Sequence, residues 1–233
     1  NLGTLIIDNS EFYKNTANGW DGGVVYNDGS LIINNSRFSN NSARNGGVVA
    51  SQVETTVVAE SSEFIGNAAE SGAAFYFEDA MASINYNSIF NNSAAIVADE
   101  DSKVNIENNW WGNNTPDFAN LLNGVESPEA YLVLNTSYVN TSSSEFDITA
   151  NLYWNGTASQ SNMDMLPDLD IELIASGGAF SQSEGIFENG VFSTIFTADA
   201  GLYTIQVIVD NEIQVLSINS TLPPKKTIQE LID

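Results

Sequence analysis

The chain has 233 residues, of which 30 are acidic and 6 are basic, so its net charge at pH 7 is −24. This charge argues against binding to nucleic acid or insertion into anionic membranes, because such partners require Lys and Arg to neutralise phosphates. The absence of Cys and His excludes disulfides and removes the commonest general base and transition-metal ligand. No apolar run approaches the roughly 20 residues that a membrane-spanning helix needs.

The first half of the chain repeats one phrase every 26 residues, marked by Phe12, Phe38, Phe64 and Phe90. A small polar residue follows each Phe by three positions: Asn15, Asn41, Asn67 and Ser93. Aliphatic runs precede each Phe, and a Gly- or Ala-rich pair opens a second apolar run after it. A fixed period of this size indicates stacked supersecondary units.

Residues 1–115 show short β-rich runs between turn residues and no helical period. They predict a parallel β-solenoid of about four to five coils, each advancing the axis by about 4.8 Å. We expect the Phe side chains to stack inside the core rather than to form a ligand-binding stripe. The Asn side chains are expected at bends, hydrogen-bonded along the axis, and the Gly pairs where unusual torsions and close approach are needed.

An imperfect fifth coil contains Trp110 and Trp111 in place of the Phe. One interpretation is a cap over the exposed core of the last coil, which a terminal repeat requires. The alternative is a sugar-binding platform. The cap is favoured, because only one of two neighbouring strand residues can face outward.

The alternation of Phe-x-x-Asn with Gly-Gly-aliphatic-aliphatic resembles the repeat of bacterial polymorphic outer-membrane proteins. It resembles even more closely the repeats of methanogen (archaeal) adhesin-like surface proteins. In those, a right-handed parallel β-helix ends in Asn-x-Trp-Trp-Gly, matched here by residues 108–113 with Gly112 as the glycine, and an Ig-like domain usually follows. The resemblance covers nearly the whole chain. It implies the right-handed twist, which the spacing alone does not.

Residues 116–129 are predicted to be a linker, with a short helical turn over residues 118–122 that packs against the solenoid end. Residues 130–221 contain six or seven alternating runs, which predict a two-sheet sandwich. The expected fold class is therefore all-β: a right-handed parallel β-helix followed by an Ig-like β-sandwich.

The run from Asp199 to Val207 resembles the penultimate strand of Ig-like domains. The resemblance implies that the Tyr203 hydroxyl pins the preceding corner, and it places Ile205 where an antibody domain has Cys. Asp210 and Asn211 are expected to form a tight turn between the last two strands.

The tail, residues 222–233, begins with two prolines and two lysines and continues with a capping-box pattern. It resembles the helix with which parallel β-helices often begin, so we expect the sequence to be an internal piece of a longer protein. A disordered end is the alternative.

Few groups of residues in this sequence could carry out chemistry, and no catalytic residue is assigned. Arg37 is the basic residue considered for a lyase-type site, but no Asp metal-ligand cluster accompanies it. Residues 99–101 form an acidic break that fits a solvated turn better than a calcium or catalytic site. Asp164, Asp168 and Asp170 are a weak calcium candidate that lacks the EF-hand spacing, so no cofactor is expected beyond calcium.

Asn-x-Ser/Thr sequons mark candidate N-glycosylation sites if the protein is exported. They begin at Asn34, Asn40, Asn91, Asn113, Asn135, Asn140, Asn155 and Asn219. Chance is a strong competitor, because the repeat is rich in Asn and Ser.

The sequence therefore predicts a fragment of an extracellular, cell-surface adhesin-like stalk that is not an enzyme. Its partner would be a protein or glycan of another cell surface, with neither nucleic acid nor membrane insertion involved. A carbohydrate-active β-helix enzyme or lectin-like module is the first alternative. A structural fibre subunit, self-associating end to end, is the second.

Overall fold

The computed structural model describes residues 1–156 and 159–221. Two compact units divide the chain: unit 1 comprises residues 1–133 and 153–167, and unit 2 comprises residues 134–152 and 168 onward. The predicted linker, residues 116–129, lies within unit 1. The predicted tail helix, residues 222–233, lies outside the described residues.

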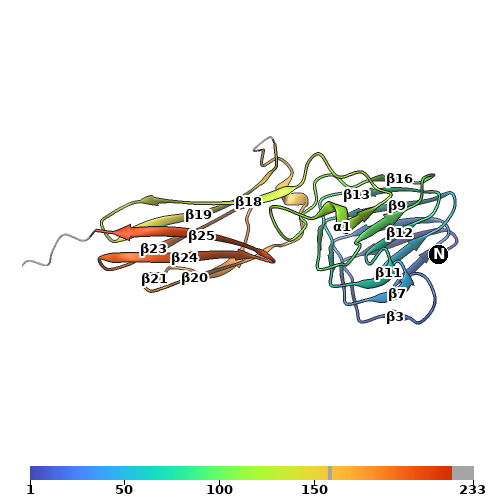
Figure 1. Ribbon diagram of the computed structural model, residues 1–233, viewed down its shortest axis with the longest axis horizontal. Coiled ribbons are helices and arrows are strands. Elements are labelled where there is room, and N and C mark those ends of the chain that lie inside the picture. Colours follow the sequence, from blue (N-terminus) through green and yellow to red (C-terminus); the bar gives the residue numbers. More distant parts are fainter. Residues whose placement is uncertain (157–158, 222–233) are drawn as a thin grey trace, which may run out of the picture. The chain divides into compact units, whose positions relative to one another are not determined.

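Unit 1 is a solenoid of about five coils, whose strands form four parallel sheets. Sheet 1 contains β1 (Thr4–Asp8), β5 (Ser30–Asn34), β9 (Thr55–Glu60), β13 (Ala80–Ile84) and β16 (Lys103–Asn105). Sheet 2 contains β2 (Glu11–Tyr13), β6 (Arg37–Ser39), β10 (Glu63–Ile65) and β14 (Ser88–Phe90). Sheet 3 contains β3 (Thr16–Ala17), β7 (Ser42–Asn45) and β11 (Ala68–Ser71), side by side in Figure 1. Sheet 4 contains β4 (Val25–Asn27), β8 (Val49–Ser51), β12 (Phe75–Phe77), β15 (Ile96–Ala98) and β17 (Leu122–Asn123).

The predicted aromatic stack is confirmed for three of its four members. Phe12, Phe38 and Phe64 are in register, with ring centroids 5.1 and 5.0 Å apart and planes within 2° of parallel. The prediction for Phe90 is wrong: Ile89 pairs with Phe64 and is fully buried, whereas Phe90 pairs with Ile65 on the outer side.

The shift at Phe90 originates in one shortened turn. Between β8 and β9 three residues intervene, but between β12 and β13 only Glu78 and Asp79 do. Consequently Met81 pairs with Thr56, 25 positions earlier, whereas Val58 pairs with Ile32, 26 positions earlier. From Ala80 to Asn92 the pairing is displaced by one position from the 26-residue count, and at β15 the interval falls further, since Ile96 pairs with Phe75, 21 positions earlier.

Two ladders of buried polar side chains join the coils at their corners. In the first, the Oδ1 atom of Asn67 accepts hydrogen bonds from the backbone N–H and the side-chain amide of Asn41, at 2.9 and 3.1 Å. Asn67 in turn donates to the Phe38 carbonyl at 3.0 Å. The fourth position is Asn92 rather than the predicted Ser93, again because of the one-residue shift.

The second corner ladder was not predicted. The side-chain oxygens of Ser36, Ser62, Asn87 and Asn109 each accept the backbone N–H of the corner residue one coil earlier, at 2.9 to 3.1 Å. The backbone N–H groups of Ser10, Ser36, Ser62 and Asn87 are thus satisfied, as buried backbone donors require. The interval between these residues falls from 26 to 22 along the chain, which hides the pattern from a strict periodicity search.

The Gly pairs have the expected backbone role. Gly46 has a φ of +63°, and a Cβ atom there would lie 2.2 Å from the Val49 carbonyl oxygen. Its neighbour Gly47 approaches the next coil, where a Cβ would lie 2.2 Å from the Ala73 carbonyl oxygen. The first of these positions needs Gly for its torsion, and both need it for space.

The end of the solenoid core is covered by aromatic residues. Trp111 belongs to the buried core, and Trp110 lies opposite Ser88 and is fully buried. Trp111 packs edge-on against Phe118 of α1 (Phe118–Leu121), which packs edge-on against Tyr131, both at 5.4 Å. The cap interpretation is confirmed, and burial of both Trp side chains rules out a Trp sugar platform.

Residues 153–156 and 159–167 extend this cap within unit 1. Asn155 exchanges two hydrogen bonds with Tyr131, at 2.6 and 2.9 Å. Ser61 donates to the Met165 carbonyl at 2.6 Å, and Trp154 packs edge-on against Tyr86 at 5.9 Å. Met163 to Met165 form a short 3-10 helix in this segment.

Unit 2 is built on two four-stranded antiparallel sheets. Sheet 5 contains, in spatial order, β18 (Leu132–Asn140), β19 (Glu145–Trp154), β23 (Val191–Thr197) and β21 (Ala179–Phe180). Sheet 6 contains β22 (Glu184–Ile186), β20 (Asp170–Ala175), β24 (Gly201–Val209) and β25 (Glu212–Ser220). Alternate residues are buried, as in β19 and β23, which matches the predicted period of two.

Contacts within unit 2 bring the two sheets together. Phe196 of sheet 5 packs edge-on against Tyr203 of sheet 6 at 5.6 Å. In the described part of the chain the Tyr203 hydroxyl makes no hydrogen bond, so the corner bond implied by the resemblance is absent there. Ile205 is fully buried. Asp210 and Asn211 form the predicted two-residue turn, since Val209 pairs with Glu212.

Candidate functional site

The weak calcium candidate is not assembled. Among residues 1–156 and 159–221, no group of three or more acidic side chains is arranged to hold a metal ion. Asp164, Asp168 and Asp170 therefore do not form a calcium site in this structure.

The acidic break at residues 99–101 is a structural turn. The Asp99 carboxylate accepts hydrogen bonds from the Ser102 hydroxyl at 2.7 Å and from the Ser102 and Asp79 backbone N–H groups at 3.0 Å. The Ser102 hydroxyl, followed by the backbone donors, lowers the pKa of Asp99 below its usual value. This carboxylate is committed to holding the turn before β16.

Arg37 is engaged in a ladder of charged side chains on the outer face of sheet 2. It forms an ion pair with Glu63 one coil later, and Glu11 is in register one coil earlier. The ion pair with Glu63 engages the Arg37 guanidinium in a structural contact between neighbouring coils.

Aromatic side chains gather on the outer face of sheet 4. Tyr26, Ala50 and Tyr76 are in register on three successive coils. Tyr26 exposes 46% of its surface and Tyr76 is half-buried, whereas Ala50 between them is fully buried. Ala50 contributes no exposed area, so the exposed part of this row consists of Tyr26 and Tyr76. We call these three residues the tyrosine row.

An ion pair lies beside the tyrosine row. Arg44 of β7 forms two parallel hydrogen bonds, both of 3.0 Å, with the carboxylate of Asp21. The bond to Asp21 raises the pKa of Arg44. Burial, followed by Glu78 and Asp21, raises the pKa of Tyr76, and burial followed by Asp28 and Asp21 raises the pKa of Tyr26. Both phenols are therefore neutral hydroxyls at pH 7.

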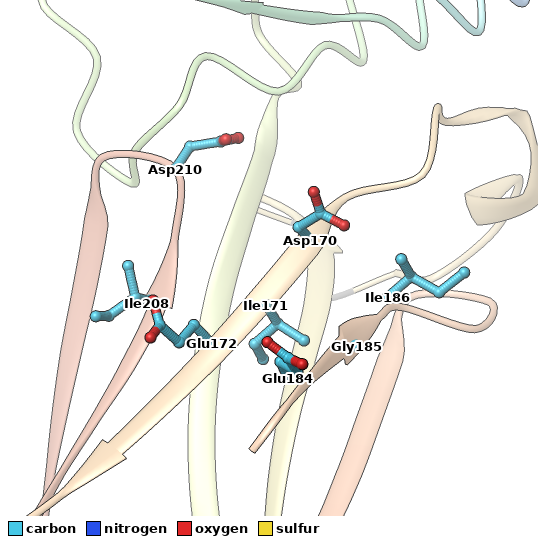
Figure 2. A pocket seen from close by; sticks show the side chains of 8 residues that line it. All are labelled: Asp170, Ile171, Glu172, Glu184, Gly185, Ile186, Ile208 and Asp210. Atoms are coloured by element: carbon cyan, nitrogen blue, oxygen red, sulfur yellow. The ribbon is translucent and has the colours of Figure 1, made fainter. Parts of the chain in front are cut away.

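A second surface feature is an open groove of about 600 Å³ on unit 2. Figure 2 shows its lining on neighbouring strands of sheet 6 and on the turn that carries Asp210. The groove is lined by the acidic residues Asp170, Glu172, Glu184 and Asp210 and by the isoleucines Ile171, Ile186 and Ile208. Nothing further in the described residues points to a ligand for this groove.

Residues 2–111 match the family model described as "Right handed beta helix region". Unit 1 is a right-handed parallel β-helix. The match ends at Trp111, the residue that completes the core row begun by Phe12. Comparison with curated proteins and with solved structures found no match.

The sequons occupy varied positions on the β-helix and on unit 2. Asn40, Asn91, Asn135, Asn140 and Asn219 are exposed, whereas Asn34, Asn113 and Asn155 are half-buried. Asn155 uses its side-chain oxygen to accept the Tyr131 N–H, and its sequon extends into residues that the structure does not describe. Over the described residues, no helix has the length and apolar character to cross a membrane.

Proposed function

We propose that this chain is part of an extracellular, adhesin-like stalk that attaches one cell surface to another. The observation that supports this proposal most directly is that parallel strands of neighbouring coils pair along the β-helix, with core and corner ladders that run from coil to coil. Parallel coils tied by backbone and side-chain hydrogen bonds make a stiff element that can hold a binding surface away from a cell.

Unit 2 is proposed to be an Ig-like sandwich that spaces the stalk. Its two antiparallel sheets, alternating burial and buried Ile205 support this assignment. Its edge strands are also tied: the Gln214 amide donates to the Leu134 carbonyl at 2.8 Å and accepts the Thr136 N–H at 3.1 Å. Such ties resist peeling of β25 from β18 under load.

Attachment rather than catalysis is supported by the ionic groups of the β-helix. Asp99 and Arg37 are both engaged in structural interactions, in a turn and in a charge ladder respectively. The exposed sequons are compatible with glycosylation of an exported protein.

The test uses the 233-residue chain displayed on beads and mixed with whole cells and with immobilised glycans. We expect beads to be retained without release of soluble sugar. Release of reducing or unsaturated sugar from a polysaccharide would instead identify an enzyme. Failure to be retained on any cell or glycan surface would overturn the attachment proposal.

A further inference from the structure

The tyrosine row has the geometry of a small, flat binding surface. Tyr26 and Tyr76 are two coils apart, which is about 9.6 Å along the β-helix axis. The parallel sheet fixes both backbones, and Ala50 between them is fully buried, so the tyrosines supply the exposed surface of the row. Two phenol rings therefore project from one face at a spacing set by the fold.

Polar groups border the row on one side. The Arg44–Asp21 pair presents a guanidinium and a carboxylate whose orientations are fixed by their two mutual bonds. The backbone N–H of Arg44 also donates to the Trp20 carbonyl at 2.9 Å, which places the backbone of the loop carrying Trp20 beside β7. Trp20 exposes 76% of its surface. Hydrogen-bonding groups of Arg44 and Asp21 thus lie next to the row.

We propose that the tyrosine row, with Arg44 and Asp21, binds a neutral, extended oligosaccharide. The proposal rests on the attachment function proposed above and names its ligand class. Sugar rings carry apolar C–H faces that pack on aromatic rings, and hydroxyls that pair with Arg, Asp and phenol groups. The separation of the two tyrosines is close to the repeat of alternate sugars along an extended β-linked chain.

Charge and area select this class over the alternatives. Asp21, Asp28 and Glu78 act on the two phenols, so an anionic sugar or a nucleic acid would meet repulsion. A stable protein interface buries roughly 800 Å² on each partner and anchors aromatic hot spots in pockets. Two rings and one ion pair on a flat sheet offer a smaller contact, which suits a short oligosaccharide.

The test titrates the full chain with neutral β-1,4-linked hexasaccharides of glucose and of N-acetylglucosamine, followed by calorimetry and by ligand-observed NMR. We expect at least one to bind, and the double variant Tyr26→Ala/Tyr76→Ala to lose affinity at least tenfold. A second variant, Ala50→Gln, enlarges the fully buried side chain between the two tyrosines, so it should displace the groups that cover it and lower affinity without removing either ring. The control is Tyr13→Ala, since Tyr13 is 52% exposed on sheet 2 of the same β-helix.

Several outcomes would overturn the proposal: no binding of either sugar, equal loss in the Tyr13→Ala control, or equally tight binding of hexagalacturonate. The same variants are then used in the bead assay. If wild-type beads adhere and the double variant adheres equally, the tyrosine row is not the binding surface and the attachment function stands. If wild-type beads do not adhere, the attachment function itself fails.

Discussion

Truncation of the central stacked phenylalanine should be among the most damaging single changes in the β-helix. Phe38 is fully buried and lies between Phe12 and Phe64, with centroid distances of 5.1 and 5.0 Å. Burial of the ring contributes about 2 to 3 kcal/mol, and each stacked pair adds about 0.5 to 1.5 kcal/mol. Together with the cavity, Phe38→Ala should lower the free energy of unfolding by about 3 to 5 kcal/mol.

The matched control is Phe90→Ala, since a strict 26-residue count treats Phe90 as equivalent whereas the structure places it on the outer side. We expect that change to cost roughly half as much or less, because partial burial leaves less apolar area to lose. Guanidinium chloride unfolding followed by circular dichroism measures both. Equal losses for the two variants, or a larger loss for Phe90→Ala, would refute the assignment of the core row.

Three further predictions concern the corners and turns. Asn67→Ala should lower the free energy of unfolding by about 2 to 3 kcal/mol, because it leaves buried partners on Asn41 and Phe38 unsatisfied. The control Asn123→Ala, at an exposed position, should change it by no more than about 0.5 kcal/mol in the same unfolding assay. Similar losses for the two variants would contradict the role of the ladder. Gly46→Ala should lower the free energy of unfolding by about 1 to 3 kcal/mol more than Gly19→Ala does. Both glycines have a positive φ, but of the two only Gly46 has backbone atoms where a Cβ would lie. Equal melting temperatures for the two variants would count against the close approach at Gly46. Because the folded-state pKa of Asp99 is depressed, its stabilisation is present above the unfolded pKa of about 4 and is lost as pH falls through the folded pKa. Wild type should therefore exceed Asp99→Asn in stability at pH 7, and a gap that persists at the acid end of a pH series of melts would exclude this role.

The 26-residue periodicity predicted correctly those features that recur at that interval in the fold. Phe12, Phe38 and Phe64 keep the 26-residue interval, and so do Asn15, Asn41 and Asn67, because the two intervals between these successive positions have the same length. The count failed at Phe90 because turn length is set by local backbone geometry rather than by the core pattern, and one shorter turn moves each later side chain to the other face.

The candidate binding surface was not predicted from the sequence. Tyr26 and Tyr76 are 50 residues apart and look like ordinary strand residues. Only the register with Ala50 shows that they share a face, and only the fold brings Arg44 and Asp21 beside them. The two tyrosines could have been found by searching for aromatic residues at outward-facing strand positions two coils apart, if the search had allowed coils of different length.

The parallel in-register stack of coils underlies the core row, the corner ladders and the tyrosine row alike. Because the chain contains no Cys, a double variant Ile32→Cys/Val58→Cys would carry the only thiols. These two residues are paired across neighbouring coils on one face, at a strand spacing of about 4.8 Å that permits a disulfide. We expect nearly complete cross-linking of this pair under mild oxidation, measured by intact mass as the loss of two hydrogens. We expect little cross-linking of the control Ile32→Cys/Thr56→Cys, because its two positions are offset by two residues. Equal cross-linking of both pairs, or preference for the offset pair, would contradict it.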